Sequence, residues 1–455
     1  MEPQQKPLTP ANPIDSLVVT AEPLTASDVT WARMDAPVQP MVVTIVLLLA
    51  QSLSEEQLRE TLRLRLLPLA RFRQRIAWSQ GRYRWLEEAP LDWNAHLQRV
   101  RLPEPADQRV LEAQLGIWVS ELLGFTRPLW RCFLVENYGT GCAVVFRVHH
   151  CIADGVALLR VFLALTDRVP DAQFVDAVTE RQRQARLAAK TTKVLAPVHG
   201  LIEKSRWAVM IGLAWLRQQW MLPDTRTALR GLLHGYKRVA WSTPIPLNEI
   251  TAIRQRLGGR INDVMLAVIT GALRHYLHTR GEIIKPTLTV RLIVPVNLRA
   301  YAEEIRLGNQ FAVVFPKLPL GVTHPATRLK IVQMQMDRLR ILPEAIANLG
   351  MINLVGRLPA RLEKLALRWF SMKATAVVTN VPGSEEPLYL AGVPIERVLA
   401  WVPQIAGIGI GISILSYAGT VTVGVMTDSG VVADPWELMA GFEAELVELA
   451  QADAA

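Results

Sequence analysis

Cysteine is scarce in this chain of 455 residues, which contains only Cys132, Cys142 and Cys151. The number is odd, and the spacing fits neither a disulfide framework nor a zinc site. The sequence also lacks a partner pair of residues with the spacing of metal ligands. We therefore expect buried free thiols in a reducing compartment, and no metal centre.

Long apolar runs are also lacking, although half of the residues are hydrophobic and the mean hydropathy is +0.20. The longest uninterrupted apolar run covers residues 207–216, whereas a helix needs about 20 apolar residues to cross a membrane. Residues 1–13 are polar and rich in proline, without the basic and apolar regions of a secretory signal. We therefore expect no transmembrane helix and a cytoplasmic protein.

Acidic residues are few in one segment, residues 181–241, which has twelve Lys or Arg and two acidic residues. Its net charge is thus +10, whereas that of the whole chain is +9. An excess confined to one segment argues against a nucleic-acid-binding fold and predicts a local basic surface. Trp207, Ile211 and Trp215 recur there at four-residue intervals, on one face if the segment is helical. That face either anchors the protein to a membrane or packs on its core.

The length suits two domains of ordinary size. Helical and extended patterns mix in both halves of the chain, so the fold class is α/β or α+β. We expect an N-terminal half at residues 1–180, a basic helical connector at 181–241 and a C-terminal half at 242–455.

Local signals predict several elements. Ser54 and Gln57 form a capping box for a helix with Leu58, Leu62 and Leu66 on one face. Two other helices are expected to present one apolar face each, formed by Val156, Leu159 and Leu163 and by Leu266, Ile269, Leu273 and Leu277. Strands are expected at 42–49, 142–150, 288–294, 311–315, 374–378, 408–415 and 421–425, with a hairpin turn at Ala418-Gly419 between the last two.

The run that points to chemistry is His-His-Cys-Ile-Ala-Asp-Gly at residues 149–155. It follows an apolar, β-branched strand, and alternation along that strand turns His149 and His150 to opposite sides. One imidazole can then face a cleft and abstract a proton from an alcohol, because its pKa lies near neutral pH. Asp154-Gly155 supplies a turn, in which glycine allows a backbone path that a side chain would hinder. A histidine pair at a strand end is more often structural than catalytic, and both readings stay open on these residues alone.

The sequence resembles the bacterial wax ester synthase/diacylglycerol acyltransferase family over nearly its whole length. The run at 149–155 matches the family's His-His-x-x-x-Asp-Gly motif. Five further elements resemble family elements in the same order: Pro-Leu-Trp at 128–130, Asn-Asp-Val at 262–264, Pro-Val-Asn-Leu-Arg at 295–299, Asn-Val-Pro-Gly at 380–383, and Leu-Tyr-Leu-Ala-Gly at 388–392. In the block at 295–299, Asn297 stands where serine is usual. Ser384 stands where a proline usually follows Asn-Val-Pro-Gly, and Cys151 where alanine is common.

The resemblance implies two halves like chloramphenicol acetyltransferase, joined by a connector, with acyl-CoA and the acceptor entering a channel between them. It implies that His150 is the general base, His149 a supporting residue, and Asp154 a structural residue paired with an arginine, for which Arg73 is the candidate. Asn262 is a candidate oxyanion donor, with helix capping as the alternative role. No cofactor is implied, since acyl-CoA is a substrate, and no covalent acyl-enzyme is required. The Pro-Leu-Trp segment at 128–130 has no group suited to catalysis and is expected to be a packing element.

The expected activity is transfer of a fatty acyl group to a long-chain alcohol or to diacylglycerol, by an enzyme peripherally associated with the inner membrane or lipid droplets. One alternative is a condensation-type acyltransferase that takes its acyl group from a carrier protein. The other is a non-catalytic lipid-binding protein. Turnover of free acyl-CoA discriminates the first reading from both alternatives.

Overall fold

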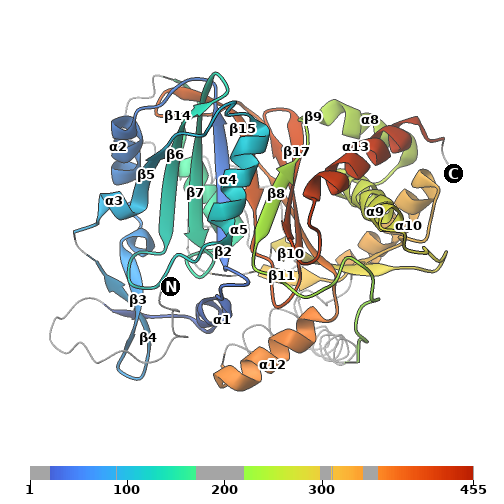
Figure 1. The fold of residues 1–455 in the computed structure, drawn as a ribbon, viewed down its shortest axis with the longest axis horizontal. Coiled ribbons are helices and arrows are strands. Elements are labelled where there is room, and N and C mark those ends of the chain that lie inside the picture. The colour runs from blue at the N-terminus through green and yellow to red at the C-terminus, as the bar shows by residue number, and fades with distance from the viewer. Residues whose placement is uncertain are drawn as a thin grey trace, which may run out of the picture.

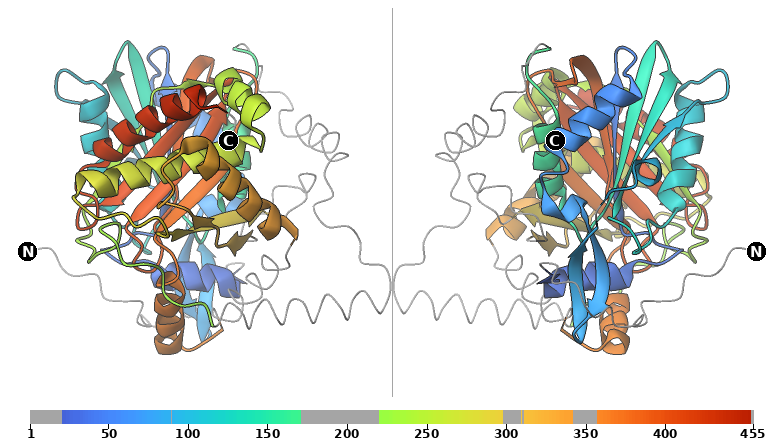
Figure 2. Two further views of the ribbon diagram at one scale, coloured as in Figure 1. Left: turned by 90° about the vertical axis from the view of Figure 1, so that its right-hand side faces the viewer. Right: turned by 90° about the vertical axis from the view of Figure 1, so that its left-hand side faces the viewer.

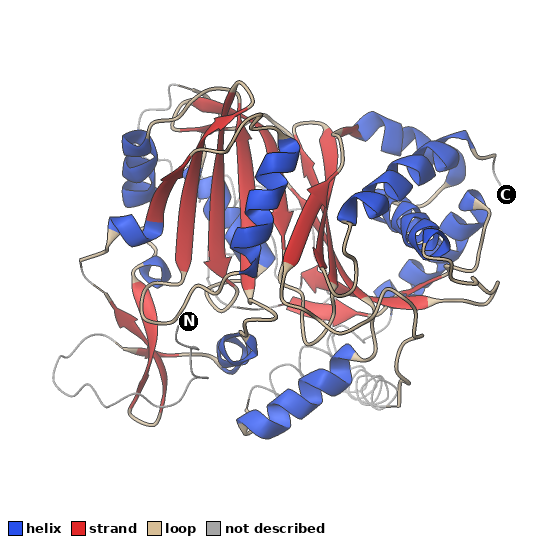
Figure 3. Ribbon diagram, in the orientation of Figure 1, coloured by secondary structure: helices blue, strands red, loops and turns tan. Residues whose placement is uncertain are grey.

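The computed structural model describes residues 21–88, 90–170, 220–297, 309, 311–341 and 357–453. Two large β-sheets stand side by side, with α4 (Gln108–Ser120) at their junction and other helices packed on their faces (Figures 1 and 3). The mixed α/β class expected from the sequence is confirmed. Among the described residues, no helix combines the length and the apolar character needed to cross a membrane.

The N-terminal sheet has six strands in the order β14-β15-β2-β7-β6-β5. Its strands are β2 (Val42–Leu49), β5 (Leu97–Val100), β6 (Trp130–Tyr138), β7 (Gly141–His149), β14 (Tyr389–Leu390) and β15 (Val393–Trp401). The apolar run of β2 is explained by burial on both faces. Ile45 and Leu47 pack into the cluster beneath α2 and α5, whereas Val46 and Leu48 pack on the opposite side beneath α4.

The helices of this half are α1 (Ala26–Met34), α2 (Glu55–Arg65), α3 (Trp93–His96), α4 (Gln108–Ser120) and α5 (Gly155–Leu165). The capping box predicted at Ser54 and Gln57 begins α2, with both of its hydrogen bonds present. The apolar face predicted for α5 is wrong by one position. Leu158, Val161 and Phe162 face the core, while Leu159 and Leu163 are half-buried.

The C-terminal sheet runs in the order β11-β10-β13-β16-β17-β8, with β12 beside β10 and β9 beside β17. Its strands are β8 (Lys237–Trp241), β9 (Ile245–Pro246), β10 (Val290–Asn297), β11 (Phe311–Val314), β12 (Lys317–Leu318), β13 (Ala376–Pro382), β16 (Ile410–Tyr417) and β17 (Thr420–Asp428). The predicted hairpin turn joins β16 to β17. Ala418 and Gly419 both have positive φ, 45° and 77°, as a two-residue turn between twisted strands requires.

Helices α8 (Leu247–Leu257), α9 (Ile261–Thr279), α10 (Pro325–Ile341) and α13 (Pro435–Gln451) build the core on one side of this sheet. Figure 2 shows α9 and α13 crossing that face. Leu266, Ile269, Leu273 and Leu277 of α9 are all buried, as predicted. Helix α12 (Ala360–Ser371) instead lies at the lower edge of the molecule, next to α1 (Figure 1).

The C-terminal half of the chain contributes two strands to the N-terminal sheet, and the segment before the boundary predicted at 241/242 contributes one strand to the C-terminal sheet. Strands β14 and β15, late in the chain, complete the N-terminal sheet, and Trp401 of β15 pairs with Thr44 of β2. Strand β8, assigned to the connector, is instead the edge strand of the C-terminal sheet and pairs with β17. Most of the predicted helical connector, including Trp207, Ile211 and Trp215, lies outside the described residues. The pairing of β15 with β2 satisfies backbone hydrogen-bonding groups that would otherwise stay at an exposed sheet edge.

A small third sheet extends from the N-terminal half, with strands β1 (Glu22–Pro23), β4 (Arg82–Glu87) and β3 (Gln74–Ser79). A short 3-10 helix, η1 (Ala70–Phe72), precedes β3. The arginine-rich run at residues 71–75 begins in η1 and ends in β3.

Candidate active site

The antiparallel pair β2–β7 positions the two histidines. His149 is the last residue of β7 and pairs with Val42, and the His150 amide donates to the Met41 carbonyl at 2.8 Å. The chain then turns into α5, whose N-cap is Asp154. The Asp154 carboxylate accepts from the Ala157 amide at 2.9 Å, which satisfies a free donor of the first helical turn. Strand, histidines and helix are therefore held in one rigid unit.

His150 is buried, with 6% of its surface exposed. The indole of Trp31, from α1, stacks on its ring with a centroid separation of 3.8 Å and an interplanar angle of 16°. Burial lowers the pKa of His150 to about 4, because the cationic form loses its hydration. The imidazole is therefore neutral at physiological pH, which is the form that can accept a proton.

Asn309 determines which nitrogen of His150 carries the proton. Its Nδ2 lies 2.9 Å from the His150 carbonyl oxygen and 3.0 Å from Asp28 Oδ1, and both of these atoms are acceptors. Nδ2 must therefore be the donor, so Oδ1 is the atom that faces His150 Nδ1 at 2.9 Å. Oδ1 can only accept, so Nδ1 bears the hydrogen. The lone pair that can take a proton is then on Nε2.

Asp28 completes a chain of hydrogen bonds to the histidine. It is 3% exposed, and burial raises the pKa of its carboxyl group, although the bonds from Asn309 and Thr25 oppose this shift. Asp28 and Trp31 are three residues apart on α1 and so lie on one helix face. A single helix thereby supplies both the stacking ring and the group that fixes Asn309.

Asp28 and Asn309 were not identified from the sequence. Asn309 lies two positions before the predicted strand at 311–315, which is the one signal that could have drawn attention to it. It is 159 positions away from His150, and no local pattern predicts a contact over that separation.

His149 has a structural environment. Its Nδ1 accepts from the Cys151 amide at 3.1 Å, and its Nε2 lies 3.6 Å from Asp35 Oδ2. The other oxygen of Asp35 accepts from the Met41 amide at 2.7 Å. Because the ring is fully buried and packed edge-on against Phe125, His149 holds the strand end in place.

The predicted pairing of Arg73 with Asp154 is wrong. Arg73 Nε lies 2.6 Å from Glu87 Oε1, across the small β3–β4 sheet, and its Nη1 donates to the Leu67 carbonyl. The neighbouring arginines also form ion pairs, Arg71 with Glu22 and Arg75 with Glu88. The arginines of this run thus pair with acidic residues of β1 and of the end of β4, and not with Asp154. These ion pairs hold the small sheet together.

The turn role predicted for Gly155 is also wrong. Gly155 is the first residue of α5 and is not among the residues with positive φ, and an added Cβ would meet no atom within 4 Å. The chain reverses before it, and Asp154 caps the helix in an extended conformation.

Asn262 lies in the first turn of α9 but does not cap it. The N-cap is Arg260, whose amide donates to Asp263 Oδ2 at 2.9 Å. Asn262 Oδ1 accepts instead from Asn380 Nδ2 of β13 at 3.1 Å. The two asparagines thus tie α9 to β13, and among the described contacts neither touches His150.

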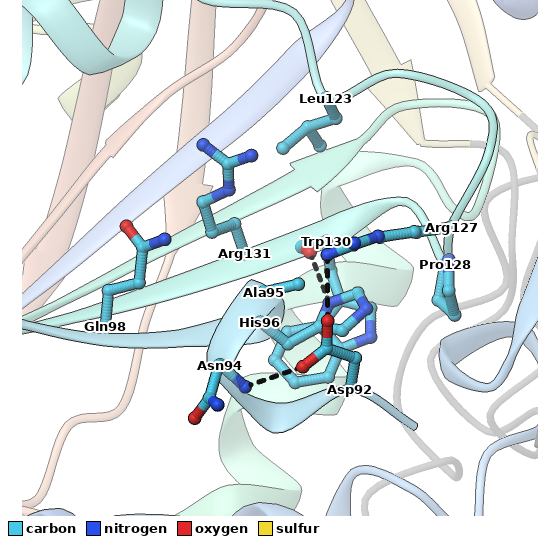
Figure 4. Close-up of a pocket in the computed structure, with 10 residues that line it drawn as sticks. All are labelled: Asp92, Asn94, Ala95, His96, Gln98, Leu123, Arg127, Pro128, Trp130 and Arg131. Atoms are coloured by element: carbon cyan, nitrogen blue, oxygen red, sulfur yellow. Dashed lines mark hydrogen bonds and ion pairs between the residues drawn. The ribbon is translucent and has the colours of Figure 1, made fainter. Parts of the chain in front are cut away.

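The Pro-Leu-Trp element is a packing element, as its residue types suggested. Leu129 and Trp130 are buried, and the Trp130 indole donates to the Phe72 carbonyl at 2.8 Å. A pocket of about 320 Å³ lies beside it (Figure 4). There His96 stacks on Trp130 and Arg127 pairs with Asp92 at 3.1 Å. The residues that line this pocket do not include Trp31, Met41 or Asn309, which contact His150.

The three cysteines are buried free thiols, as expected. Burial raises the pKa of the Cys151 thiol well above its usual range, so this residue beside His150 is not a thiolate nucleophile. Among the described residues, no group of His, Cys, Asp or Glu could hold a metal ion.

Comparison with known families decides the identity. The profile of the wax ester synthase/diacylglycerol acyltransferase catalytic domain matches residues 24–265, and that of the WS/DGAT C-terminal domain matches residues 307–450. The chain belongs to the wax ester synthase/diacylglycerol acyltransferase family. It is therefore an acyltransferase, and both β7 with its histidines and α1 with Asp28 fall within the catalytic-domain match.

Individual relatives of this acyltransferase agree. It is 26% identical over 411 residues to a probable diacylglycerol O-acyltransferase of Mycobacterium tuberculosis, covering 87% of this chain and 88% of that protein. The wax ester synthase/diacylglycerol acyltransferase from Marinobacter aquaeolei VT8 has a similar structure, with a TM-score of 0.70, 22% identity and coverage of 94% and 98% of the two chains. The first condensation domain of the calcium-dependent antibiotic synthetase shares the fold at 16% identity, a TM-score of 0.60 and coverage of 95% and 96%.

Proposed function

We propose that this acyltransferase transfers a fatty acyl group from acyl-CoA to the hydroxyl group of a long-chain alcohol or of diacylglycerol, with His150 as the general base. The product is a wax ester or a triacylglycerol. The observation that carries the assignment of the base is the hydrogen bond from His150 Nδ1 to Asn309 Oδ1. It favours the tautomer in which Nε2 can accept a proton.

In the proposed reaction the acceptor oxygen attacks the thioester carbonyl carbon while His150 Nε2 takes the hydroxyl proton. The carbonyl oxygen becomes an oxyanion in a tetrahedral intermediate. This intermediate collapses by breaking the carbon–sulfur bond, and the departing thiolate receives the proton from the imidazolium. His150 is thereby restored to its neutral form, and no group of the protein is acylated.

The environment of His150 suits both proton transfers. A pKa of about 4 keeps the base neutral before the reaction. The same burial makes the imidazolium a strong acid, so that it readily returns the proton to sulfur. Because Trp31 and Asn309 already hold the ring, little rearrangement is needed when the substrates bind.

The acceptors and products are lipids, and we further propose that the enzyme associates peripherally with the inner membrane or with lipid droplets. The net charge of +10 in residues 181–241 supports this assignment, because basic residues are attracted to anionic lipid surfaces.

The test is an acceptor panel with palmitoyl-CoA, with products separated by thin-layer chromatography. We expect ester formation with alcohol or diacylglycerol, and a loss of about 10²–10⁴-fold in His150→Ala, the usual contribution of a general base. His149→Ala should lower the melting temperature more than the turnover of the folded fraction. An active His150→Ala enzyme together with a fully folded but inactive His149→Ala enzyme would reverse the assignment. If acyl transfer occurred only from an acyl carrier protein, the proposed donor, acyl-CoA, would be wrong.

A further inference from the structure

Helix α12 presents an amphipathic face to solvent. Leu362, Leu365 and Met372 are exposed by 52%, 64% and 36%, and the half-buried Trp369 lies between the last two in the sequence. These four residues follow the spacing i, i+3, i+7 and i+10, so they form one stripe along the helix. An exposed apolar stripe of this kind is unfavourable in water and marks an interaction site when it is contiguous.

A basic stripe lies beside the apolar one. Arg361, Lys364 and Arg368 are exposed and follow the spacing i, i+3 and i+7. The one acidic residue of α12, Glu363, is buried on the opposite face. The exposed face of α12 therefore carries three positive charges and no negative charge.

The chain at residues 220–224 extends this surface beyond the end of α12. Its Asp224 amide donates to the Met372 carbonyl at 2.8 Å, and Arg291 donates to both the Leu222 and Lys373 carbonyls. Trp220 and Leu222 are exposed by 83% and 76%. Two large apolar side chains thus lie on a segment fixed to the C-terminal end of the α12 face.

We propose that the exposed face of α12, with Trp220 and Leu222, docks on an anionic lipid surface; this inference rests on the lipid acceptor of the proposed function. Tryptophan and leucine enter the interfacial region of a bilayer, and the adjacent basic stripe matches anionic headgroups. A second copy of the chain fits less well. A twofold contact would bring two identical basic stripes together, and like charges in an interface repel.

The docking face is connected to the candidate active site through one helix. Glu363, on the buried side of α12, lies 2.7 Å from Arg33 Nη1 of α1, and the same nitrogen donates to the Leu358 carbonyl at 3.2 Å. Helix α1 is the element that carries Asp28 and Trp31 against Asn309 and His150. Docking through α12 would therefore place the lipid surface on the side of the molecule where α1 approaches the base.

The test is flotation of the full chain with vesicles of phosphatidylcholine, alone or mixed with phosphatidylglycerol. The variants are Arg361→Gln/Lys364→Gln on α12 and, as a control with the same charge change, Arg280→Gln/Lys285→Gln on the α9–β10 loop. Leu365→Ser is matched in the same way by Ile283→Ser, which is 91% exposed on that loop. Melting temperatures confirm that each variant is folded.

We expect binding only to the anionic vesicles, weakened by high salt. The α12 charge variant should lower the partition coefficient by about 25-fold, since each basic residue near an anionic surface contributes about fivefold. The control pairs should bind like the original chain. Equal losses in both charge variants, or equal binding to neutral vesicles, would overturn the proposal. So would a dimer in solution that Leu365→Ser converts to a monomer, because that result assigns the face to a second copy.

Vesicle binding does not depend on turnover, so the two proposals fail separately. A chain that floats with anionic vesicles but esterifies no acceptor contradicts the proposed reaction and supports the docking face. A chain that esterifies dispersed alcohol but does not float contradicts the docking face.

Discussion

Replacing Asn309 should impair catalysis without removing any group that touches the reacting atoms. In Asn309→Ala the His150 Nδ1–H group loses its acceptor, and the His150 carbonyl and Asp28 lose their donor. An unsatisfied buried donor costs about 1–3 kcal/mol, equivalent to about 5- to 150-fold in rate. The tautomer is then no longer fixed, and a wrongly held catalytic histidine in the serine proteases costs about 10⁴-fold.

We therefore expect kcat of Asn309→Ala to fall by about 10²–10³-fold, with KM changed by less than about threefold. Asn309→Asp makes a sharper test. Its carboxylate still accepts from Nδ1, whereas the donor that serves the His150 carbonyl and Asp28 is lost. A new negative charge beside His150 favours the imidazolium, so the acidic limb of the kcat/KM profile should move to higher pH.

The exchange variant Asp28→Asn/Asn309→Asp serves as the control, because it restores an amide-to-carboxylate hydrogen bond with the original net charge. It should be more active than Asn309→Ala. Steady-state kinetics across pH, on variants with melting temperatures near that of the original enzyme, provide the measurement. The reasoning is refuted by an Asn309→Ala enzyme with unchanged kcat and pH profile, or by an Asn309→Asp profile that does not move.

Two further predictions concern pH. Because the pKa of His150 is lowered to about 4, kcat/KM should stay constant as the pH falls from 7 to about 5 and should decrease only nearer pH 4. If kcat/KM instead decreased around pH 6.5, the ordinary pKa of histidine, the base would be a solvated imidazole or another group. The second prediction concerns Glu112 of α4, which is 2% exposed at the junction of the halves. The Gln108 amide donates to the Glu112 carboxyl group and to the Trp241 carbonyl. Burial raises the pKa of Glu112 to about 8. The folded state then keeps a proton that the unfolded chain releases above about pH 4.5, so stability falls as the pH rises towards 8, by up to about 1.4 kcal/mol per pH unit. Glu112→Gln should remove this slope in urea unfolding at pH 5, 6.5 and 8, and parallel curves for the two proteins would contradict the buried, protonated carboxyl group.

Features that depend on neighbours in the chain could be predicted from the sequence. The apolar run of β2, the capping box at Ser54 and the hairpin turn at Ala418-Gly419 all match the structure, because period, cap and turn are determined by residues a few positions apart. The ordered family motifs also identified the acyltransferase, and the His-His-x-x-x-Asp-Gly run located the strand end on which the candidate base lies.

The tertiary structure alone decided how distant segments meet at that base. Asn309 and Asp28 contact His150 or each other across separations of 159 and 281 residues. The pairing of β15 with β2 and of β8 with β17 likewise joins segments that are far apart in the sequence. Arg73 was wrongly assigned for the same reason: a guanidinium pairs with whichever carboxylate the fold brings nearest, and here that is Glu87 of β4. A pattern in sequence records which groups are available, whereas the hydrogen-bond partners of buried groups are chosen by packing, which no local window contains.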